Sequence, residues 1–98
     1  MMQVAFRPEA RLEVLAAREW YDQHVPGLGR EFAHAVDRAI ASIRQNPFAY
    51  DQVEVDCRRV LLQRFPYSLV YRVESDTVVV VAVFHHSREP GFWRKRLR

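Results

Sequence analysis

The sequence CRRVLLQRFPYSLVYRVESDTVVVVAVFHH, residues 57–86, contains three apolar stretches that two short turn sequences separate. The first turn is Phe65-Pro66-Tyr67 and the second is Glu74-Ser75-Asp76, and clusters of this kind end strands. Val, Leu, Tyr and Phe dominate the stretches between them, as is typical of β-strands. We therefore predict an antiparallel meander with strands at 57–65, 67–73 and 77–86.

The two faces of this meander are expected to be covered by different parts of the protein. In the first strand Val60 and Leu62 fall on one face, whereas Arg59 and Leu61 fall on the other, because side chains alternate along a strand. The next two strands are apolar on both faces, which indicates that both faces are covered. Helices are expected to cover the first face. The second face is expected to carry Leu61, Val70, Ala82 and Phe84. It needs another cover, which is either the aromatic tail, through Phe92 and Trp93, or a partner chain, or both.

The residues before the meander predict a strand and two helices. Residues 3–6 form a short strand candidate, and apolar residues spaced by three and four predict helices at 8–24 and about 30–45. A Val-Pro-Gly-Leu-Gly link of five residues between the helices favours an antiparallel hairpin. Residues 48–56 are expected to be a polar, irregular connection. The fold class is thus α+β: a single domain, 1–98, with an N-terminal strand, a helical hairpin, a mostly antiparallel sheet and a basic tail.

Basic residues are concentrated in the second half of the chain. Residues 1–56 carry six arginines against nine acids, a net charge of −3, whereas residues 57–98 carry eight arginines and one lysine against three acids, a net charge of +6. The guanidinium group of arginine binds phosphate and carboxylate through paired hydrogen bonds. The pattern therefore favours specific binding of an anionic partner, and the alternative is a solvated basic surface.

Several classes of protein and site are not expected. With one cysteine, Cys57, the chain forms no intramolecular disulfide, which fits a reducing, cytoplasmic location. The longest apolar run, 77–84, is too short to span a bilayer, and the N-terminus does not read as a signal peptide. His85 and His86 point to opposite faces of a strand, so no metal site is predicted. No cofactor is predicted either, since the glycines fall in turns and form no phosphate-binding loop.

The tail after the last strand mixes aromatic and basic residues. Residues 87–98 read SREPGFWRKRLR. Arginines bind phosphate and Trp or Phe stack on bases, so the tail is a candidate nucleic-acid contact. The alternative is structural, with the aromatics capping the sheet and the arginines solvated.

This order of elements resembles the RelE/ParE superfamily of bacterial type II toxins, and in particular its ParE-like branch. The similarity extends over nearly the whole chain, and its most specific parts are Arg64-Phe65-Pro66-Tyr67 and the tail pattern Arg88-x-Pro90-x-x-Trp93-x-x-Arg96. Other matching blocks are FRPEA at 6–10, WY at 20–21, PGLGREF at 26–32, NP at 46–47 and Arg58-Arg59. The resemblance implies a growth-inhibiting toxin that a cognate antitoxin neutralises by direct binding, in a hetero-oligomeric complex away from any membrane.

The resemblance also implies two alternative targets. RelE-like members cleave mRNA in the ribosome with several basic side chains, of which this chain would supply Arg59 and Arg88, with His85 or His86 as a general base. Leu61 and Ser68 stand where further basic residues are expected, so the set is incomplete. The chain is more similar to ParE toxins, which act on DNA gyrase; a third alternative is a degenerate, non-toxic regulator that only binds antitoxin.

These inferences assign two sets of residues. The residues expected to contact the target or nucleic acid are Arg58, Arg59, Arg64, Arg88, Trp93 and Arg96. The residues expected to contact the antitoxin are Leu61, Val70 and Phe84.

Overall fold

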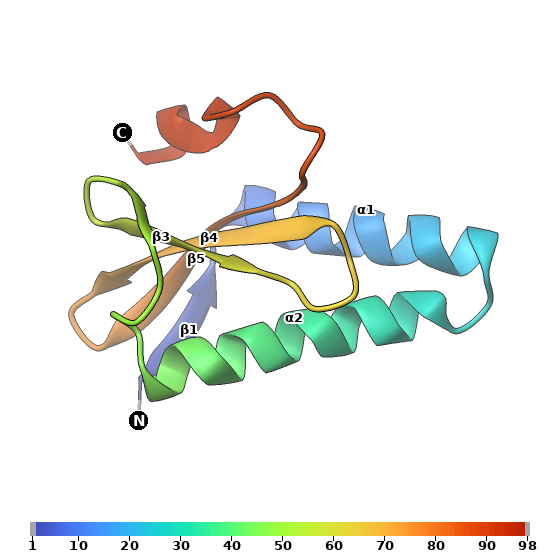
Figure 1. Ribbon diagram of the computed structural model, residues 1–98, viewed down its shortest axis with the longest axis horizontal. Coiled ribbons are helices and arrows are strands. Elements are labelled where there is room, and N and C mark those ends of the chain that lie inside the picture. Colours follow the sequence, from blue (N-terminus) through green and yellow to red (C-terminus); the bar gives the residue numbers. More distant parts are fainter. Residues whose placement is uncertain (1, 98) are drawn as a thin grey trace.

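The computed structural model describes residues 2–97 and consists of a helical hairpin, a five-stranded sheet and a C-terminal 3-10 helix (Figure 1). The strand order is β1-β5-β4-β3-β2, with β1 parallel to β5 and every other pair antiparallel. The predicted meander is therefore β3-β4-β5, and the predicted N-terminal strand joins its far edge. The elements are β1 (Gln3–Phe6), α1 (Pro8–His24), α2 (Leu28–Gln45), β2 (Gln52–Glu54), β3 (Cys57–Leu61), β4 (Tyr67–Glu74), β5 (Thr77–His85) and η1 (Phe92–Leu97).

The hairpin turns tightly because two glycines allow it. Gly27 has φ +88°, a left-handed conformation that a side chain disfavours. At Gly29 a Cβ atom would come far too close to the carbonyl oxygen of Arg18 and to the carboxylate of Asp22. That carboxylate accepts a hydrogen bond of 2.8 Å from the backbone N–H of Gly29, so α1 satisfies a free N–H group in the first turn of α2. As a result α2 begins at Leu28, slightly earlier than the predicted start.

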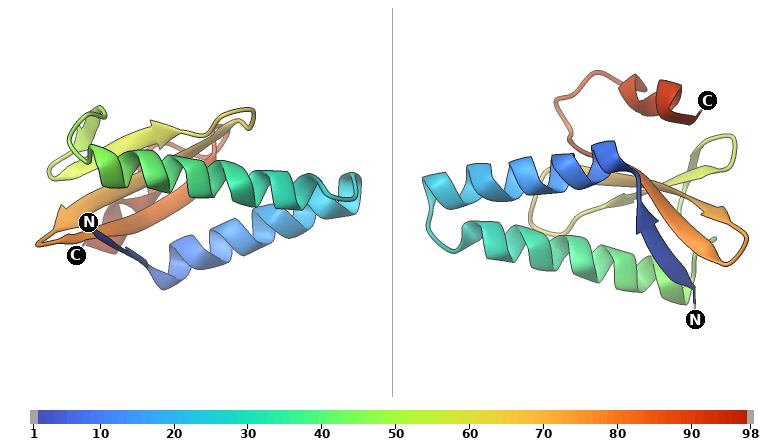
Figure 2. Two further views of the ribbon diagram at one scale, coloured as in Figure 1. Left: turned by 90° about the horizontal axis from the view of Figure 1, so that it is seen from below. Right: turned by 180° about the vertical axis from the view of Figure 1, so that it is seen from behind.

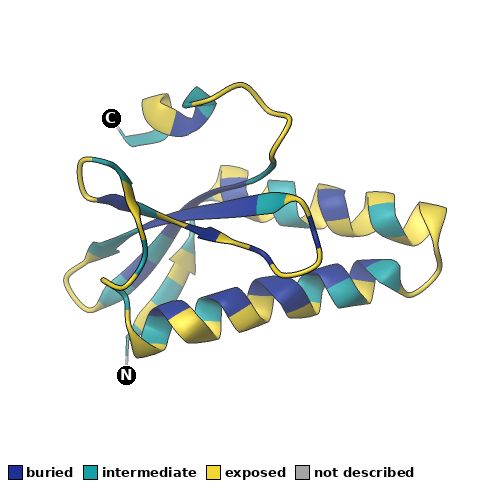
Figure 3. Cartoon of the chain, in the orientation of Figure 1, coloured by how far each residue is buried: buried dark blue, intermediate teal, exposed yellow. Residues whose placement is uncertain are grey.

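The hairpin covers the first face of the sheet, as predicted (Figure 2). Figure 3 shows the buried stripe of α2 facing the sheet. The largest contributions come from Phe32 and Ile43 of α2, and from Leu69, Tyr71 and Val80 of the strands. Burial of this apolar surface is the main force that holds the two layers together.

The tail covers the second face, so the expectation that Phe92 and Trp93 fold back is confirmed. Trp93 is only 4% exposed and packs with Val70 and Ala82, while Phe92 lies against the edge of Phe84 with ring centroids 5.2 Å apart. In Figure 1 the tail and η1 lie on the side of the sheet away from the hairpin. The cover is incomplete, because Leu61 remains 59% exposed.

Several predicted boundaries were wrong. Residues 48–56 are not wholly irregular, because β2 pairs with β3 as a short edge strand. The strand predicted at 57–65 ends at Leu61, since the chain turns through residues 62–66, where Arg64 has φ +73°. The last strand ends at His85, one residue earlier than predicted. Within the described residues, no helix is long and apolar enough to cross a membrane.

The edge of β5 has an unusual partner beyond the end of β1. β1 pairs only with residues 77–80, so the following residues of β5 lack a neighbouring strand on that side. The carboxylate of Glu13 accepts a hydrogen bond of 3.0 Å from the N–H of Val83, and the guanidinium of Arg96 donates one of 3.1 Å to the carbonyl of Val81. Glu13 and Arg96 also form an ion pair of 2.9 Å with each other. One pair of side chains thus bonds two backbone groups of β5 that have no strand partner and links the tail to α1.

Candidate binding groove on the second face of the sheet

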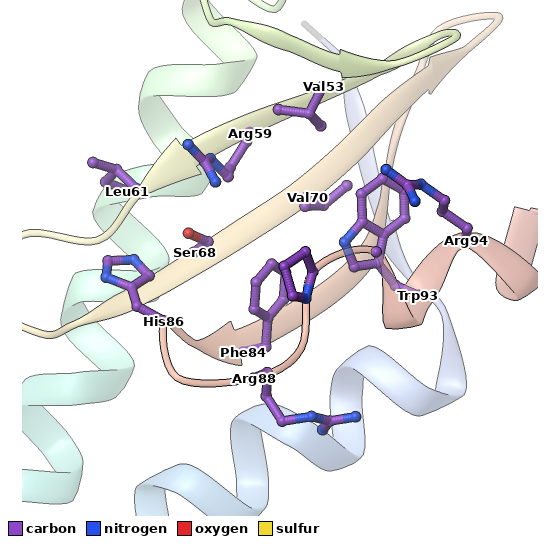
Figure 4. Close-up of a pocket in the computed structure, with 12 residues that line it drawn as sticks. Val53, Arg59, Leu61, Ser68, Val70, Phe84, His86, Arg88, Trp93 and Arg94 are labelled. Carbon is purple, nitrogen blue, oxygen red and sulfur yellow. The ribbon is translucent and has the colours of Figure 1, made fainter.

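A groove of about 460 Å³ lies between the second face of the sheet and the tail (Figure 4). Its floor comes from β3, β4 and β5, and one wall comes from the residues that follow β5. The groove is lined by Val53, Arg59, Leu61, Ser68, Val70, Phe84, His86, Arg88, Pro90, Gly91, Trp93 and Arg94. We call this surface the binding groove.

The strand register determines which side chains adjoin one another on the floor. Leu61 pairs with Ser68, and Ser68 pairs with Phe84, so these three side chains form a row across the sheet. Arg59 pairs with Val70 in the next row. Diagonal neighbours on one face of a sheet are about 7–8 Å apart at Cα, so the long side chain of Arg59 reaches the row that contains Ser68.

Two arginines of the groove have no acidic partner among residues 2–97, and they lie in different parts of it, Arg59 on the floor and Arg88 on the wall that follows β5. Within residues 2–97, the ion pairs include neither Arg59 nor Arg88. The guanidinium carbon of Arg88 lies 3.7 Å from the ring centroid of Phe92, which is a close cation–π contact. Figure 4 shows its guanidinium group turned away from Arg59 and Ser68. The groove therefore has one unpaired guanidinium group at its floor and a second at its outer rim, while its third arginine, Arg94, is paired with Glu54.

The predicted basic surface is not continuous, because the other arginines have internal partners. Arg64 lies outside the groove and pairs with Glu31 of α2 at 2.7 Å. Arg58 is on the hairpin side of β3, where it donates to the carbonyl of Tyr50 at 2.7 Å. Arg96 is held in the ion pair with Glu13, and the two side chains are only 12% and 18% exposed.

Trp93 also differs from the expected arrangement. It lines the groove, but with 4% of its surface exposed it serves mainly as core and offers no open ring face for a base. Of the six residues expected to contact the target, the structure thus brings Arg59, Arg88 and Trp93 together, and leaves Arg58, Arg64 and Arg96 elsewhere. Sequence alone does not identify the partners of long arginine side chains, since the acids concerned are distant in the chain.

All three residues expected to contact the antitoxin line the same groove. Leu61, Val70 and Phe84 alternate with the basic residues because they share one face of adjacent strands. The two predicted sets therefore meet in one place. The signal that could have shown this is the strand register, which places Arg59 beside Val70.

Of the two histidines considered as a general base, His85 does not line the groove. Tyr67 pairs with His85, and the two rings contact each other edge-on at 5.3 Å on the hairpin side of the sheet. The Nδ1 atom of His85 also lies 3.0 Å from the backbone N–H of Ser87. His86 is the histidine that lines the groove. A nuclease would therefore have to use His86 together with Arg59 and Arg88.

Two further groups complete the chemistry of the second face. Burial raises the pKa of Cys57 above its usual value, in spite of the opposing effect of Arg72, so the thiol is a packing group. The hydroxyl of Ser68 is buried and, within residues 2–97, has no hydrogen-bond partner. No cluster of three or more potential metal ligands occurs in the described part of the chain.

Comparison with known proteins identifies the family. The family model for the ParE toxin of the type II toxin–antitoxin system parDE matches residues 4–90. A search of curated protein sequences gives no significant match.

Solved structures of toxins share the fold. A chain of the chromosomal ParDE toxin–antitoxin system from P. aeruginosa superposes with a TM-score of 0.75 at 20% identity, covering 87% of this chain and 96% of that one. The intact RelBE toxin–antitoxin complex from E. coli gives a TM-score of 0.63 at 19% identity, covering 90% of this chain and 100% of that one. The isolated E. coli RelE toxin gives 0.63 at 19% identity, with full coverage of both chains.

The family model includes the hairpin, the sheet and most of the residues that line the groove, and the structures agree with it in fold. The chain belongs to the ParE toxin family of type II toxin–antitoxin systems.

Proposed function

We propose that this toxin inhibits growth by binding its target, with DNA gyrase as that target, and that an antitoxin neutralises it by covering the binding groove. The observation that carries the proposal is the small number of free cations in the groove. Of the arginines that line the groove, only Arg59 and Arg88 have no acidic partner among residues 2–97, and they point in different directions.

Cleavage of RNA demands more than this groove supplies. A nuclease has to activate the 2′-hydroxyl, stabilise the charge that develops on the phosphate, and protonate the leaving oxygen. Leu61 and Ser68 contribute no charge at the floor of the groove, and the Arg88 guanidinium is stacked on Phe92. Loss of one positioned charged group commonly lowers a rate by about 10²–10³-fold. Binding without cleavage is therefore the better-supported mode of action.

The apolar part of the groove supports an antitoxin-binding role. Leu61 is more than half exposed beside the buried Val70, and Phe84 is partly covered by the tail. Exposed apolar residues also continue along the outer surface of α1, at Leu12 and Leu15. An antitoxin that lies along the hairpin and the groove would bury this surface and cover Arg59 at the same time.

The gyrase assignment is tested with purified toxin in a supercoiling assay. The expected result is inhibition of supercoiling by gyrase with accumulation of cleaved DNA, and both effects should disappear when antitoxin is added. If the toxin neither binds gyrase nor changes supercoiling, the target assignment is wrong.

The alternative mode of action is tested on translating ribosomes. Toeprinting that shows cleavage in the A site, and loss of that cleavage with Arg88→Ala, would favour a ribosome-dependent nuclease. Normal growth when the toxin is overexpressed without its antitoxin would instead favour the non-toxic regulator.

Arg88 distinguishes target binding from antitoxin binding. Arg88→Ala is expected to reduce toxicity while leaving antitoxin affinity within a few-fold of wild type, because charges at an interface rim contribute little to stability of the complex. Growth assays and calorimetry measure the two effects. Loss of both together, with a lowered Tm, would mean that Arg88 supports the tail through Phe92 and is not a contact residue.

A further inference from the structure

Ser68, the second residue of β4, has a buried hydroxyl group on its side chain. The residue is completely buried, and within residues 2–97 no group forms a hydrogen bond with its Oγ atom. An unsatisfied buried hydroxyl destabilises the folded protein, and an alanine at this position would avoid that cost. A buried polar group of this kind requires an explanation, and a ligand that completes its hydrogen bonding is one.

The position of Ser68 points to such a ligand. Its side chain is on the groove side of β4, between Leu61 and Phe84, with His86 beside it (Figure 4). Ser68 lines the groove although its own surface is buried, and Leu61, its neighbour in the same row, is 59% exposed. The proposed site requires a ligand that displaces part of this exposed side chain to reach the hydroxyl.

The charge next to Ser68 defines the ligand as an anion. Arg59 is exposed in the adjacent row of the floor, and no acid among residues 2–97 pairs with it. A hydroxyl donor and a guanidinium group with several N–H donors together form a site for a group that is negatively charged and accepts hydrogen bonds. Carboxylate and phosphate both fit this description.

The rest of the groove favours a carboxylate on a peptide over a phosphate of a nucleic acid. The floor around Arg59 and Ser68 is apolar, formed by Leu61, Val70 and Phe84. A nucleic-acid strand requires a series of free cations and open aromatic faces. Arg94 is already paired with Glu54, Trp93 is buried, and the face of Phe92 is occupied by Arg88.

We propose that Arg59 and Ser68 form a carboxylate subsite, which receives one Asp or Glu side chain of the antitoxin while neighbouring apolar residues of the antitoxin pack on Val70 and Phe84. This inference rests on the proposed neutralisation by antitoxin. It adds the chemistry that the antitoxin segment must have, namely an acidic residue flanked by apolar ones. It also assigns a role to a serine that stands where a nuclease would need a basic residue.

The variant Ser68→Ala gives a result that a purely structural serine would not give. Removal of an unsatisfied hydroxyl should leave the Tm of the free toxin unchanged or raise it. The affinity for the antitoxin should fall by about 10–100-fold, the effect of losing one hydrogen bond to a charged group. Arg59→Ala should weaken binding by about 10–100-fold. The matched control is Arg64→Ala, an exposed arginine outside the groove, for which a change below about 3-fold is expected.

The experiment uses the full-length toxin and the protein encoded by the neighbouring open reading frame, with Kd measured by calorimetry. Each Asp and Glu of that protein is changed to its amide in turn and measured against wild-type toxin and against Arg59→Ala. At one position the amide should weaken binding to wild-type toxin but have no further effect on Arg59→Ala, because the two changes remove the same contact.

The outcomes separate this proposal from the broader function. If the neighbouring protein binds but the toxin variants at Ser68 and Arg59 bind it as tightly as wild type does, the subsite is refuted and neutralisation by antitoxin stands. If it does not bind at all, neutralisation fails and the subsite fails with it. If no acidic position couples to Arg59 and a single-stranded 12-nucleotide DNA competes for the groove, the site takes phosphate and the carboxylate assignment is overturned.

Discussion

Replacement of Arg96 by methionine is expected to destabilise the protein far more than any replacement of an exposed arginine. Arg96 makes two contacts with the carboxylate of Glu13 and one with the carbonyl of Val81, and both side chains of the pair are more than four-fifths buried. Methionine keeps much of the aliphatic stem but removes all of these hydrogen bonds. It leaves a largely buried carboxylate without its counter-charge.

The size of the effect follows from this burial. Removal of one partner of a buried ion pair typically costs about 3–5 kcal/mol. We expect the lower end, about 3 kcal/mol, because Glu13 keeps its hydrogen bond to the N–H of Val83. In a domain of this length, 1 kcal/mol corresponds to about 4–8 °C in Tm, so the Tm should fall by roughly 12–24 °C. The matched control is Arg94→Met in the same 3-10 helix, whose ion pair with Glu54 is exposed and should contribute less than about 1 kcal/mol.

The assay measures both the global stability of the protein and the packing of the tail on the sheet. Trp93 is buried under the tail and Trp20 is exposed, so the variants are made in a Trp20→Phe background in which Trp93 is the only tryptophan. Denaturant unfolding gives the change in free energy. Acrylamide quenching under native conditions reports whether Trp93 becomes accessible. In Arg96→Met the tail should loosen before the rest unfolds, so quenching should rise well below the unfolding midpoint.

A clear result would refute this reasoning. If Arg96→Met is as stable as Arg94→Met and Trp93 stays equally protected from quenching, then the pair with Glu13 does not hold the tail. In that case the packing of Trp93 alone would hold the tail in place as the wall of the groove.

Three further predictions concern other parts of the molecule. Burial raises the pKa of Tyr71 from 10.0 to about 12, so the folded state keeps the phenol proton at higher pH than the unfolded state does. The resulting stabilisation is fully present below pH 10 and is lost as the pH rises through 12, with about 2 kcal/mol lost by pH 11.5. Tyr71→Phe should remove that part of the slope in urea titrations at pH 8 and 11.5. Gly29→Ala should cost about 1–3 kcal/mol by calorimetry because the new methyl group meets the carbonyl of Arg18, and an unchanged Tm would show that the hairpin adjusts freely. Cys57 should react with a thiol reagent only when the protein unfolds, since it is buried and its pKa is raised; rapid labelling of native protein would contradict its packing role.

The candidate site was less predictable than the fold. The alternation of Val60 and Leu62 with Arg59 and Leu61 correctly indicated two faces of a sheet, and the aromatic tail correctly indicated a cover for the second one. Neither pattern showed which arginines would be free. The difference between Arg59 and Arg96 lies in residues distant in the chain, because Arg96 meets Glu13 and Arg59 meets no acid among residues 2–97.

The features that the sequence by itself determined are the secondary-structure elements and their turns, which depend on local signals. Apolar periodicity, Pro and Gly at the turns, and the run of β-branched residues in 77–83 specify the hairpin and the meander, since these signals act over a few neighbouring residues.

Only the tertiary structure decided how these elements end and what their charges do. β1 is shorter than β5, so the carbonyl of Val81 and the N–H of Val83 have no neighbouring strand to bond. Arg96 donates to that carbonyl, and Glu13 accepts from that N–H. Because Arg96 makes these contacts, its guanidinium group is largely buried, and the tail that carries it is held in place as a wall of the groove. The physical reason is that a buried backbone group must find a partner, and long side chains supply one from wherever the fold brings them.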